Sequence, residues 1–226
     1  MIRTAFVALS ACLVLWQAEP KRIELLFLGH TSRHHDSGRY APILEKVATQ
    51  HGITLTYTTD PNDLKPEKLR GYDALMIYAN HTKITPEQEK ALLDFVAGGR
   101  GFLPIHSASF CFQNSPDYIA LVGAQFQRHG TGEFTAEIVE PGHPTLSGVT
   151  PFQVWDETYV HTKHNTDRTV LMERVDAQGR EPWTWVRTHG KGRVFYTAYG
   201  HDERAWSHPT FQRLLINAIL WVTGRS

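Results

Sequence analysis

The chain contains few cysteines and no excess of charge of either sign. Its 226 residues include only two cysteines, Cys12 and Cys111. This low number excludes a disulfide framework and any cysteine-rich zinc site. Lysine plus arginine number 23, as do aspartate plus glutamate, so no electrostatic footprint indicates a nucleic-acid partner. The remaining composition, 41% hydrophobic and 20% charged, is typical of a globular domain.

The apolar run at residues 5–16 is too short to span a lipid bilayer. Arg3 precedes it and the polar residues 17–20 follow it, a pattern typical of a secretory signal. We therefore expect an exported protein, periplasmic or secreted, with no integral membrane span in its mature form. Residues 1–20 would be the signal and residues 21–226 a single domain.

Three interpretations of the N-terminal apolar run remain open, and two of them are export routes. Residues 9–12 (LSAC) resemble a lipobox, which would place a lipid anchor on Cys12. Ordinary signal cleavage near Ala18 is the alternative, although Trp16 is a poor residue for the −3 position. A buried N-terminal helix is the third reading.

Alternating apolar and amphipathic segments predict an α/β domain. The first half contains strands and helices in alternation, which implies a mainly parallel sheet with helices on both faces. The predicted strands there are 22–29, 53–58, 74–79 and 101–105, and the predicted helices are 40–50, 85–97 and 115–121. The second half predicts an antiparallel extension of this sheet and a closing helix. Its predicted strands are 133–139, 169–175, 183–188 and 193–199, and its helix is 209–223.

The sequence has thirteen histidines, and several of them follow predicted strands. Ligands of open α/β sheets bind beyond the carboxyl ends of the strands. Histidine is the side chain best able to bind metals or move protons near neutral pH. The sequence therefore predicts a histidine-rich pocket, centred on His106, at this edge of the sheet. The histidines that follow strands are His30, His34, His35, His81, His106 and His201.

His106 stands in the segment 104–109 (PIHSAS), where a strand ends in a tight turn of small residues. This arrangement resembles a nucleophile elbow, which exposes one side chain at the edge of a sheet. The later segment 201–203 (HDE) resembles the histidine and carboxylate of class I glutamine amidotransferase-like domains. In those enzymes the elbow carries a nucleophilic cysteine. Here it carries His106, and Cys111 lies five residues further on, so the sequence predicts neither amidotransferase nor cysteine-protease chemistry.

Several motifs together resemble the trehalose-utilisation, or ThuA-like, family. The resemblance covers nearly the whole chain after residue 21 and implies the class I glutamine amidotransferase-like fold, a flavodoxin-like three-layer sandwich. It also implies a small carbohydrate as partner, because the family is associated with trehalose and related sugars, including oxidised keto-sugars. The segments that carry it are 34–36, 106–109, 118–126 with His129, 142–144, 155–159, 185–187, 190–194 and 200–202.

The segment 155–159 (WDETY) is predicted to form a loop. A carboxylate there suits a general base or a metal ligand, and Glu157 is the stronger candidate, followed by Asp156. The aromatic rings of Trp155 and Tyr159 suit stacking on a sugar. The alternative is a solvated acidic loop flanked by core aromatic residues.

The remaining histidine motifs predict less chemistry. His129 precedes a glycine-containing segment and is expected to line the pocket. His161 and His164 have helical ligand spacing but no helix signal. His143 and His208 each precede proline and indicate a turn and a helix start. The segment 190–193 (GKGR) lacks the spacing of a phosphate loop and fits a hairpin turn better.

Two classes of function fit these residues. The first is a carbohydrate enzyme of hydrolase or isomerase type, acting on a trehalose-like or keto-sugar glycoside. Its proton transfers would use His106, His201 and Glu157, directly or through a divalent metal, with zinc as the default. The metal ligands would be His35, His106 and His201. The substrate contacts would be His35, Ser107, His129, Trp155, Asp156, Tyr159 and Asp202.

The second class is a non-catalytic exported sugar-binding module with Trp155, Tyr159 and Trp206 as platforms. A pathway partner of a sugar dehydrogenase is a further alternative, and a homo-oligomer is compatible with either. We favour the enzyme because a binding module does not need several ionisable groups in one pocket. The single-pocket mechanism requires His106 and His201 to lie within about 10 Å of each other, because shared ligation needs close contact.

Overall fold

The computed structural model of the chain describes residues 21–32, 34–177 and 179–226. The predictions of a signal segment and of a lipid on Cys12 therefore lie outside the described residues. Among the described residues, no helix combines the length and the apolar character needed to cross a membrane.

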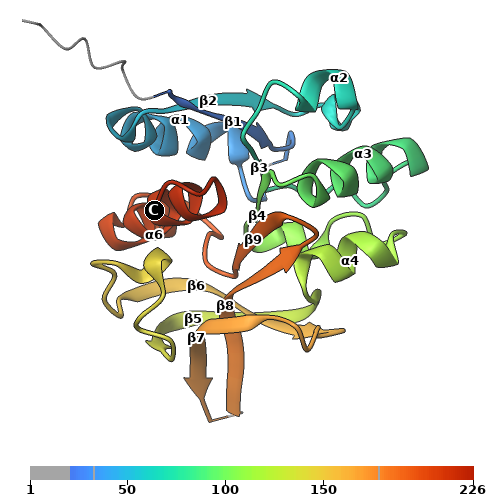
Figure 1. Cartoon of the computed structure of the whole chain (residues 1–226). Helices are drawn as coiled ribbons and strands as arrows, with labels where there is room; N and C mark the ends of the chain where they lie inside the picture. Colours follow the sequence, from blue (N-terminus) through green and yellow to red (C-terminus); the bar gives the residue numbers. More distant parts are fainter. Residues whose placement is uncertain (1–20, 33, 178) are drawn as a thin grey trace, which may run out of the picture.

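Nine strands form one sheet in the order β2-β1-β3-β4-β9-β8-β7-β5-β6 (Figure 1). The strands from β2 to β9 pair in parallel, and those from β9 to β6 pair antiparallel. The predicted mainly parallel sheet with an antiparallel extension is confirmed. The strands are β1 (Ile23–Leu28), β2 (Ile53–Thr58), β3 (Ala74–Ile77), β4 (Gly101–Pro104), β5 (Gln125–Ile138), β6 (Gln153–Thr162), β7 (Thr169–Asp176), β8 (Gly179–His189) and β9 (Gly192–Thr197).

Helices cover both faces of the parallel part of the sheet (Figure 1). Helices α1, α5 and α6 pack together on one face, and α2, α3 and α4 lie on the other. The α-helices are α1 (Ser37–Ala48), α2 (Pro66–Leu69), α3 (Pro86–Ala97), α4 (Pro116–Val122), α5 (Glu203–Trp206) and α6 (Pro209–Val222). Short 3₁₀ helices are η1 (Thr49–His51), η2 (Pro61–Asp63), η3 (His106–Phe110) and η4 (Pro144–Leu146).

Local signals in the sequence fix the helix ends. The Thr85 side chain accepts a hydrogen bond from the Gln88 backbone, and the Gln88 side chain accepts one from the Thr85 backbone. This reciprocal capping box satisfies two backbone donors at the start of α3. His143 and His208 each cap a helix that begins with proline, so their predicted structural roles are confirmed.

The prediction of a loop at residues 155–159 is wrong, because this segment lies inside β6. β5 also begins at Gln125, eight residues before the predicted start, and therefore includes His129. The two strands pair along most of their length. The sequence of β6 does not show the alternation typical of a strand, because β6 buries the polar side chains of Asp156, Glu157 and His161 where an ordinary strand would bury apolar ones.

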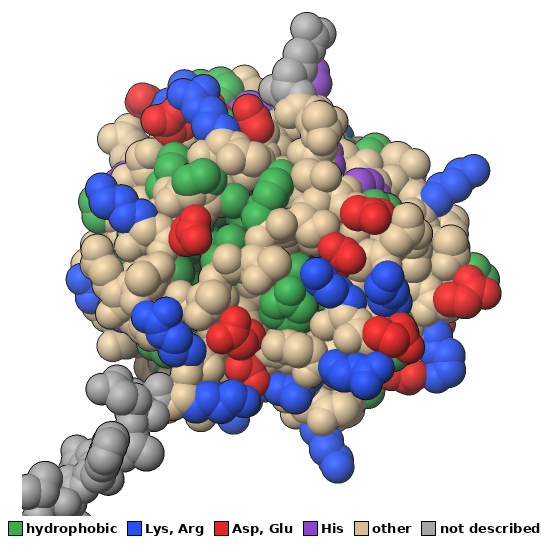
Figure 2. Space-filling model, turned by 90° about the horizontal axis from the view of Figure 1, so that it is seen from above, with side chains coloured by type: hydrophobic (Ala, Val, Ile, Leu, Met, Phe, Trp, Pro, Cys, Tyr) green, Lys and Arg blue, Asp and Glu red, His purple; other side chains and the backbone are tan. Residues whose placement is uncertain are grey.

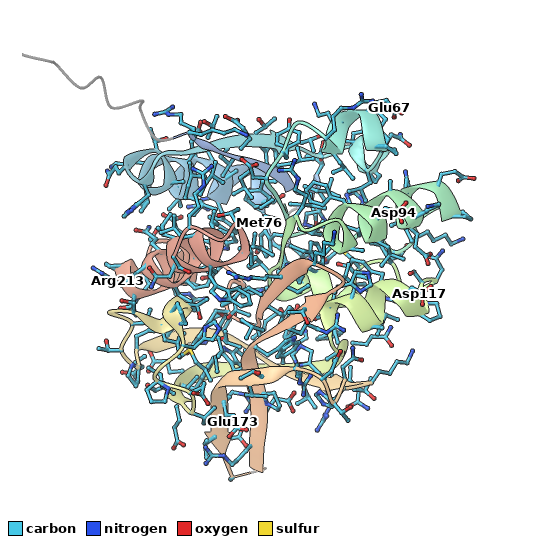
Figure 3. All side chains as sticks on the ribbon, viewed as in Figure 1. Glu67, Met76, Asp94, Asp117, Glu173 and Arg213 are labelled. Carbon is cyan, nitrogen blue, oxygen red and sulfur yellow. The ribbon has the colours of Figure 1, made fainter. Side chains whose placement is uncertain are left out.

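The sheet separates two helical layers, and the core fills the space between them. Met76 of β3 is fully buried and lies near the centre of the molecule, whereas Asp94 and Asp117 lie on the outer helices (Figure 3). On the face shown in Figure 2, basic and acidic side chains alternate without forming a field of one sign. This distribution agrees with the balanced charge of the sequence.

The topology places the loops after β1, β3, β4 and β9 at one edge of the sheet. β1 lies between β2 and β3. The connection from β1 leads to β2 on one side, whereas the connection from β2 returns to β3 on the other side of β1. Such a switch point opens a crevice at the carboxyl ends of the strands. The fold therefore brings the predicted histidine loops to the place where α/β proteins bind ligands.

Candidate active site

Four side chains from four parts of the chain meet at the carboxyl edge of the sheet. They are His35 after β1, His106 after β4, Glu157 on β6 and His201 after β9. Each offers one nitrogen or oxygen atom, and these atoms all lie within 4.8 Å of one another. The requirement that His106 and His201 lie within about 10 Å of each other is met, since their ring centroids are 5.9 Å apart.

His106 has a left-handed backbone, with φ of 46°. This conformation costs a non-glycine residue about 1–3 kcal/mol, and it persists only where the surroundings hold it. The His106 Nδ1 donates a hydrogen bond to the Ala198 carbonyl at 2.6 Å, which leaves Nε2 to face the site. Tyr159 stacks on the ring with centroids 4.1 Å apart. Burial lowers the pKa of His106 to about 4, so the ring is neutral near pH 7.

His35 enters the site from the loop before α1 and also has a positive φ, 56°. Its Nε2 lies 3.3 Å from Glu157 Oε2, and its Nδ1 lies 3.3 Å from the Asn80 side-chain amide nitrogen. The Asn80 Oδ1 atom is buried without a hydrogen-bond partner in the described part of the chain. Sequence reasoning missed Asn80, although the neighbouring His81 was noticed because it follows the same strand.

Glu157 is the centre of the cluster. Its Oε2 lies 3.2 Å from His106 Nε2, and its Oε1 lies 3.2 Å from His201 Nδ1 and 3.6 Å from His129 Nε2. Burial alone would raise the pKa of this carboxyl, but its close contacts with the rings of His106, His201 and His35 outweigh burial and hold the pKa well below its usual range. Glu157 is therefore an anion set among imidazole rings.

Asp156 is fully buried and touches backbone rather than solvent. Its carboxylate accepts hydrogen bonds from the backbone N–H groups of Glu157 (2.8 Å), Gly200 (2.9 Å) and His201 (3.1 Å). Burial raises its pKa to about 7, against the opposing effect of these three donors. Asp156 is 0% exposed and is not among the residues that line the pocket beside the cluster. Asp156 instead ties the His201 loop to β6.

His201 lies in a loop that needs glycine. Gly200 has a φ of 130°, and a Cβ atom at this position would come within 3.4 Å of the His106 side chain. The Gly200 carbonyl accepts hydrogen bonds from the Tyr78 hydroxyl (2.7 Å) and the Trp206 indole (2.9 Å). Burial disfavours the charged form of His201, but the adjacent Glu157 carboxylate outweighs burial and raises the pKa of the ring.

A pocket of about 160 Å³ opens beside the cluster. His129 stands at its rim with 39% of its side chain exposed, and its Nδ1 donates to the Gly130 carbonyl at 3.0 Å. Phe110 and Phe126 form an aromatic wall that sequence reasoning did not assign to the site. Phe126 lay in a family motif, but nothing in that motif distinguished a pocket wall from a core position. The lining is His35, Asn80, Phe110, Phe126, His129, Glu157 and Tyr159.

Besides Asp156, three of the predicted substrate contacts fall outside this pocket. Ser107 is fully buried and does not line the pocket. Trp155 lies near the His201 ring, but the guanidinium of Arg204 covers its face at 3.7 Å. Asp202 caps α5 and pairs with Arg204. Neither Trp155 nor Asp202 lines the pocket.

The other histidines that follow strands have structural contacts. His30 Nε2 donates to the His35 carbonyl at 3.0 Å, and His81 Nε2 donates to the Gly29 carbonyl at 3.0 Å. These bonds shape the loop that carries His35. His161 lies on β6, is not a member of the cluster, and pairs through Nδ1 with Glu181.

Cys111 is buried away from the cluster, and its thiol donates to the Ala79 carbonyl at 2.8 Å. Burial raises the pKa of this thiol well above its usual range, which leaves it without nucleophilic thiolate.

We expect Cys111→Ala to cost about 1 kcal/mol of stability, a usual value for a core change. Metal content and turnover of the folded variant should stay at the wild-type level in elemental analysis and rate assays. Loss of turnover in a folded Cys111→Ala protein would restore a cysteine mechanism.

The fold is similar to that of solved ThuA-like proteins. The ThuA-like protein of Bacteroides uniformis is 22% identical with a TM-score of 0.77, over 93% of this chain and 95% of its own. That of Parabacteroides merdae is 16% identical with a TM-score of 0.75, over 90% of each chain. A β-galactosidase from Rahnella sp. R3 is 14% identical with a TM-score of 0.65, over 91% of this chain and 32% of its own. At these identities the likeness shows the fold alone.

No curated protein matches the chain. The model of the family ThuA, described as trehalose utilisation, matches residues 24–222. That range covers the parallel strands, the antiparallel extension and all four residues of the cluster. The chain therefore belongs to the ThuA family.

Proposed function

We propose that the protein is a carbohydrate-processing enzyme, which acts on a trehalose-like or keto-sugar glycoside by histidine and carboxylate chemistry assisted by a divalent metal. One observation supports the chemistry above all others: His35, His106, Glu157 and His201 present their ligand atoms within 4.8 Å of one another. The sugar comes from the description of the family, trehalose utilisation.

The cluster fits a cation. Because His106 Nδ1 donates to a carbonyl, the neutral ring turns the lone pair of Nε2 toward the Glu157 carboxylate, 3.2 Å away. Two electron-rich atoms at this distance repel each other unless a proton or a metal lies between them. A tetrahedral zinc site with bonds of about 2.0–2.2 Å separates its ligand atoms by roughly 3.3–3.6 Å. The separations of 3.2 and 3.3 Å from Glu157 to His106 and His35 are close to that spacing.

His35, His106, Glu157 and His201 would hold the metal, with Glu157 as a fourth ligand beyond the three predicted histidines. When bound, a divalent metal polarises a sugar carbonyl or lowers the pKa of a bound water. The Ala198 carbonyl accepts from His106 Nδ1 and orients that ring from behind, as partners of ligating histidines commonly do. His129 stands at the rim, where its Nε2 can accept a proton from the substrate.

The sugar-binding module fits the structure less well. Its platforms require exposed aromatic faces. Trp206 is only 1% exposed, Tyr159 is 2% exposed, and Arg204 covers Trp155. A module of this kind also gives no reason to bury an anionic carboxylate among three imidazoles.

The proposal is tested by incubating the protein with trehalose and with trehalose oxidised to a ketone on one ring, and following the products by NMR. We expect turnover of at least one sugar, its loss after treatment with a chelator, and its return with zinc. His106→Ala should show no turnover with or without zinc.

His51→Ala is the matched control, because His51 is exposed at the end of η1, outside the site. It should behave as the wild type does. Binding of both sugars without conversion by zinc-loaded protein would favour the binding module. Full turnover in the presence of the chelator would contradict the role of the metal.

A further inference from the structure

A second group of polar side chains lies buried directly beneath His106. The hydroxyls of Ser109 and Tyr196 each donate to the His106 backbone carbonyl, at 3.1 and 3.0 Å. These two hydroxyls are also 3.0 Å from each other. Ser109 is 2% exposed and Tyr196 0% exposed, so neither reaches a substrate.

The group continues into the antiparallel extension of the sheet. His161 Nε2 lies 2.9 Å from the Tyr196 hydroxyl, and His161 Nδ1 lies 3.1 Å from Glu181 Oε1. Because a carboxylate only accepts, His161 donates through Nδ1 and presents the lone pair of Nε2 to Tyr196, so the single hydroxyl proton of Tyr196 is shared between His161 Nε2 and the His106 carbonyl. Glu181 also accepts from the His161 backbone N–H at 3.0 Å, which fixes both residues relative to each other. Trp185 stacks on the Tyr196 ring at 4.1 Å and holds it in place.

The carbonyl that receives these two hydroxyls belongs to the residue with the unusual backbone. His106 has a positive φ, and such a conformation needs support from its surroundings. A hydrogen bond on its carbonyl restricts rotation of the peptide that sets where the imidazole points. The direct support comes from η3 and β9, which carry Ser109 and Tyr196, and β6 and β8 support Tyr196 in turn through His161 and Glu181.

We propose that Ser109, Tyr196, His161 and Glu181 form a positioning network that holds His106 in the orientation needed to bind the metal. The inference rests on the proposed function, because it assigns His106 as a ligand. The network supplies none of the residues that line the pocket and none of the other three members of the cluster. Its effect on the site therefore passes through His106.

The test measures zinc affinity of metal-free protein by competition with a chromophoric chelator. Tyr196→Phe removes one hydroxyl and keeps the ring. We expect it to weaken zinc binding by at least about tenfold, the lower end of the effect of residues behind a metal ligand. We also expect a changed visible absorption spectrum of the cobalt-substituted variant, because the His106 ligand becomes less well oriented.

Tyr199→Phe is the matched control, since Tyr199 is equally buried but packs against Phe134 and Phe152. It should keep wild-type affinity and the wild-type cobalt spectrum. Ser109→Ala provides a second variant should Tyr196→Phe fail to fold, and the same loss of affinity is expected. Folded variants that bind zinc as tightly as Tyr199→Phe would overturn the network and leave the metal site intact. Wild-type protein that binds no zinc would instead overturn the proposed function.

Discussion

Glu157→Gln is expected to lower the affinity for zinc by more than about hundredfold, beyond the effect of changing a residue behind a ligand. The substitution keeps the size of the side chain and removes its charge. Glu157 contacts His35, His106 and His201 at 3.2–3.3 Å, so no other residue of the cluster touches as many ligand atoms. Titration of metal-free protein with zinc, followed by calorimetry, measures the change.

Glu45→Gln is a suitable control for this experiment, because Glu45 is an exposed residue of α1. It removes the same charge and should leave zinc affinity unchanged. Should Glu157→Gln bind zinc as tightly as Glu45→Gln does, the carboxylate is not a ligand. The histidines would then need another explanation.

Asp156→Ala is expected to lower the free energy of unfolding by about 3 kcal/mol. Three buried N–H groups lose their acceptor, and each unpaired donor costs about 1–3 kcal/mol. Relief from burying the Asp156 carboxyl offsets part of this loss. Urea denaturation measures the change. Zinc affinity should fall as well, because the loop that carries His201 loses its tie to β6.

Asp94→Asn is the comparison for this change, since Asp94 makes an exposed pair with Lys90 on α3. Such surface pairs contribute at most about 1 kcal/mol. The loss of stability in Asp156→Asn should lie between the losses in Asp94→Asn and Asp156→Ala, because the single carbonyl oxygen of asparagine can replace only part of the carboxylate. Wild-type stability in Asp156→Ala would show that the His201 loop is held by other contacts.

The sequence was sufficient to predict the scaffold because its local signals agree with one another. The capping box at Thr85, the glycine after α1 and the apolar strands all favour the same alternation of strands and helices. The strand-to-loop positions of His35, His106 and His201 then followed from the topology. Their meeting point could therefore be predicted from the sequence.

The part of the site that β6 contributes could not be predicted in the same way. β6 buries Asp156 and Glu157 at adjacent positions, which breaks the alternation that identifies a strand. The polarity that made Glu157 a candidate also made its segment resemble a loop. Ser107 and Asp156 show the same limit, since a sequence does not reveal whether a side chain near a site faces the pocket or the core.

An anomalous difference map from a crystal grown with zinc, recorded at the zinc absorption edge, tests the central claim most directly. We predict one strong peak about 2.0–2.2 Å from ligand atoms of His35, His106, Glu157 and His201. A zinc-soaked crystal with no peak between these four residues, or with its strongest peak elsewhere, would contradict the account.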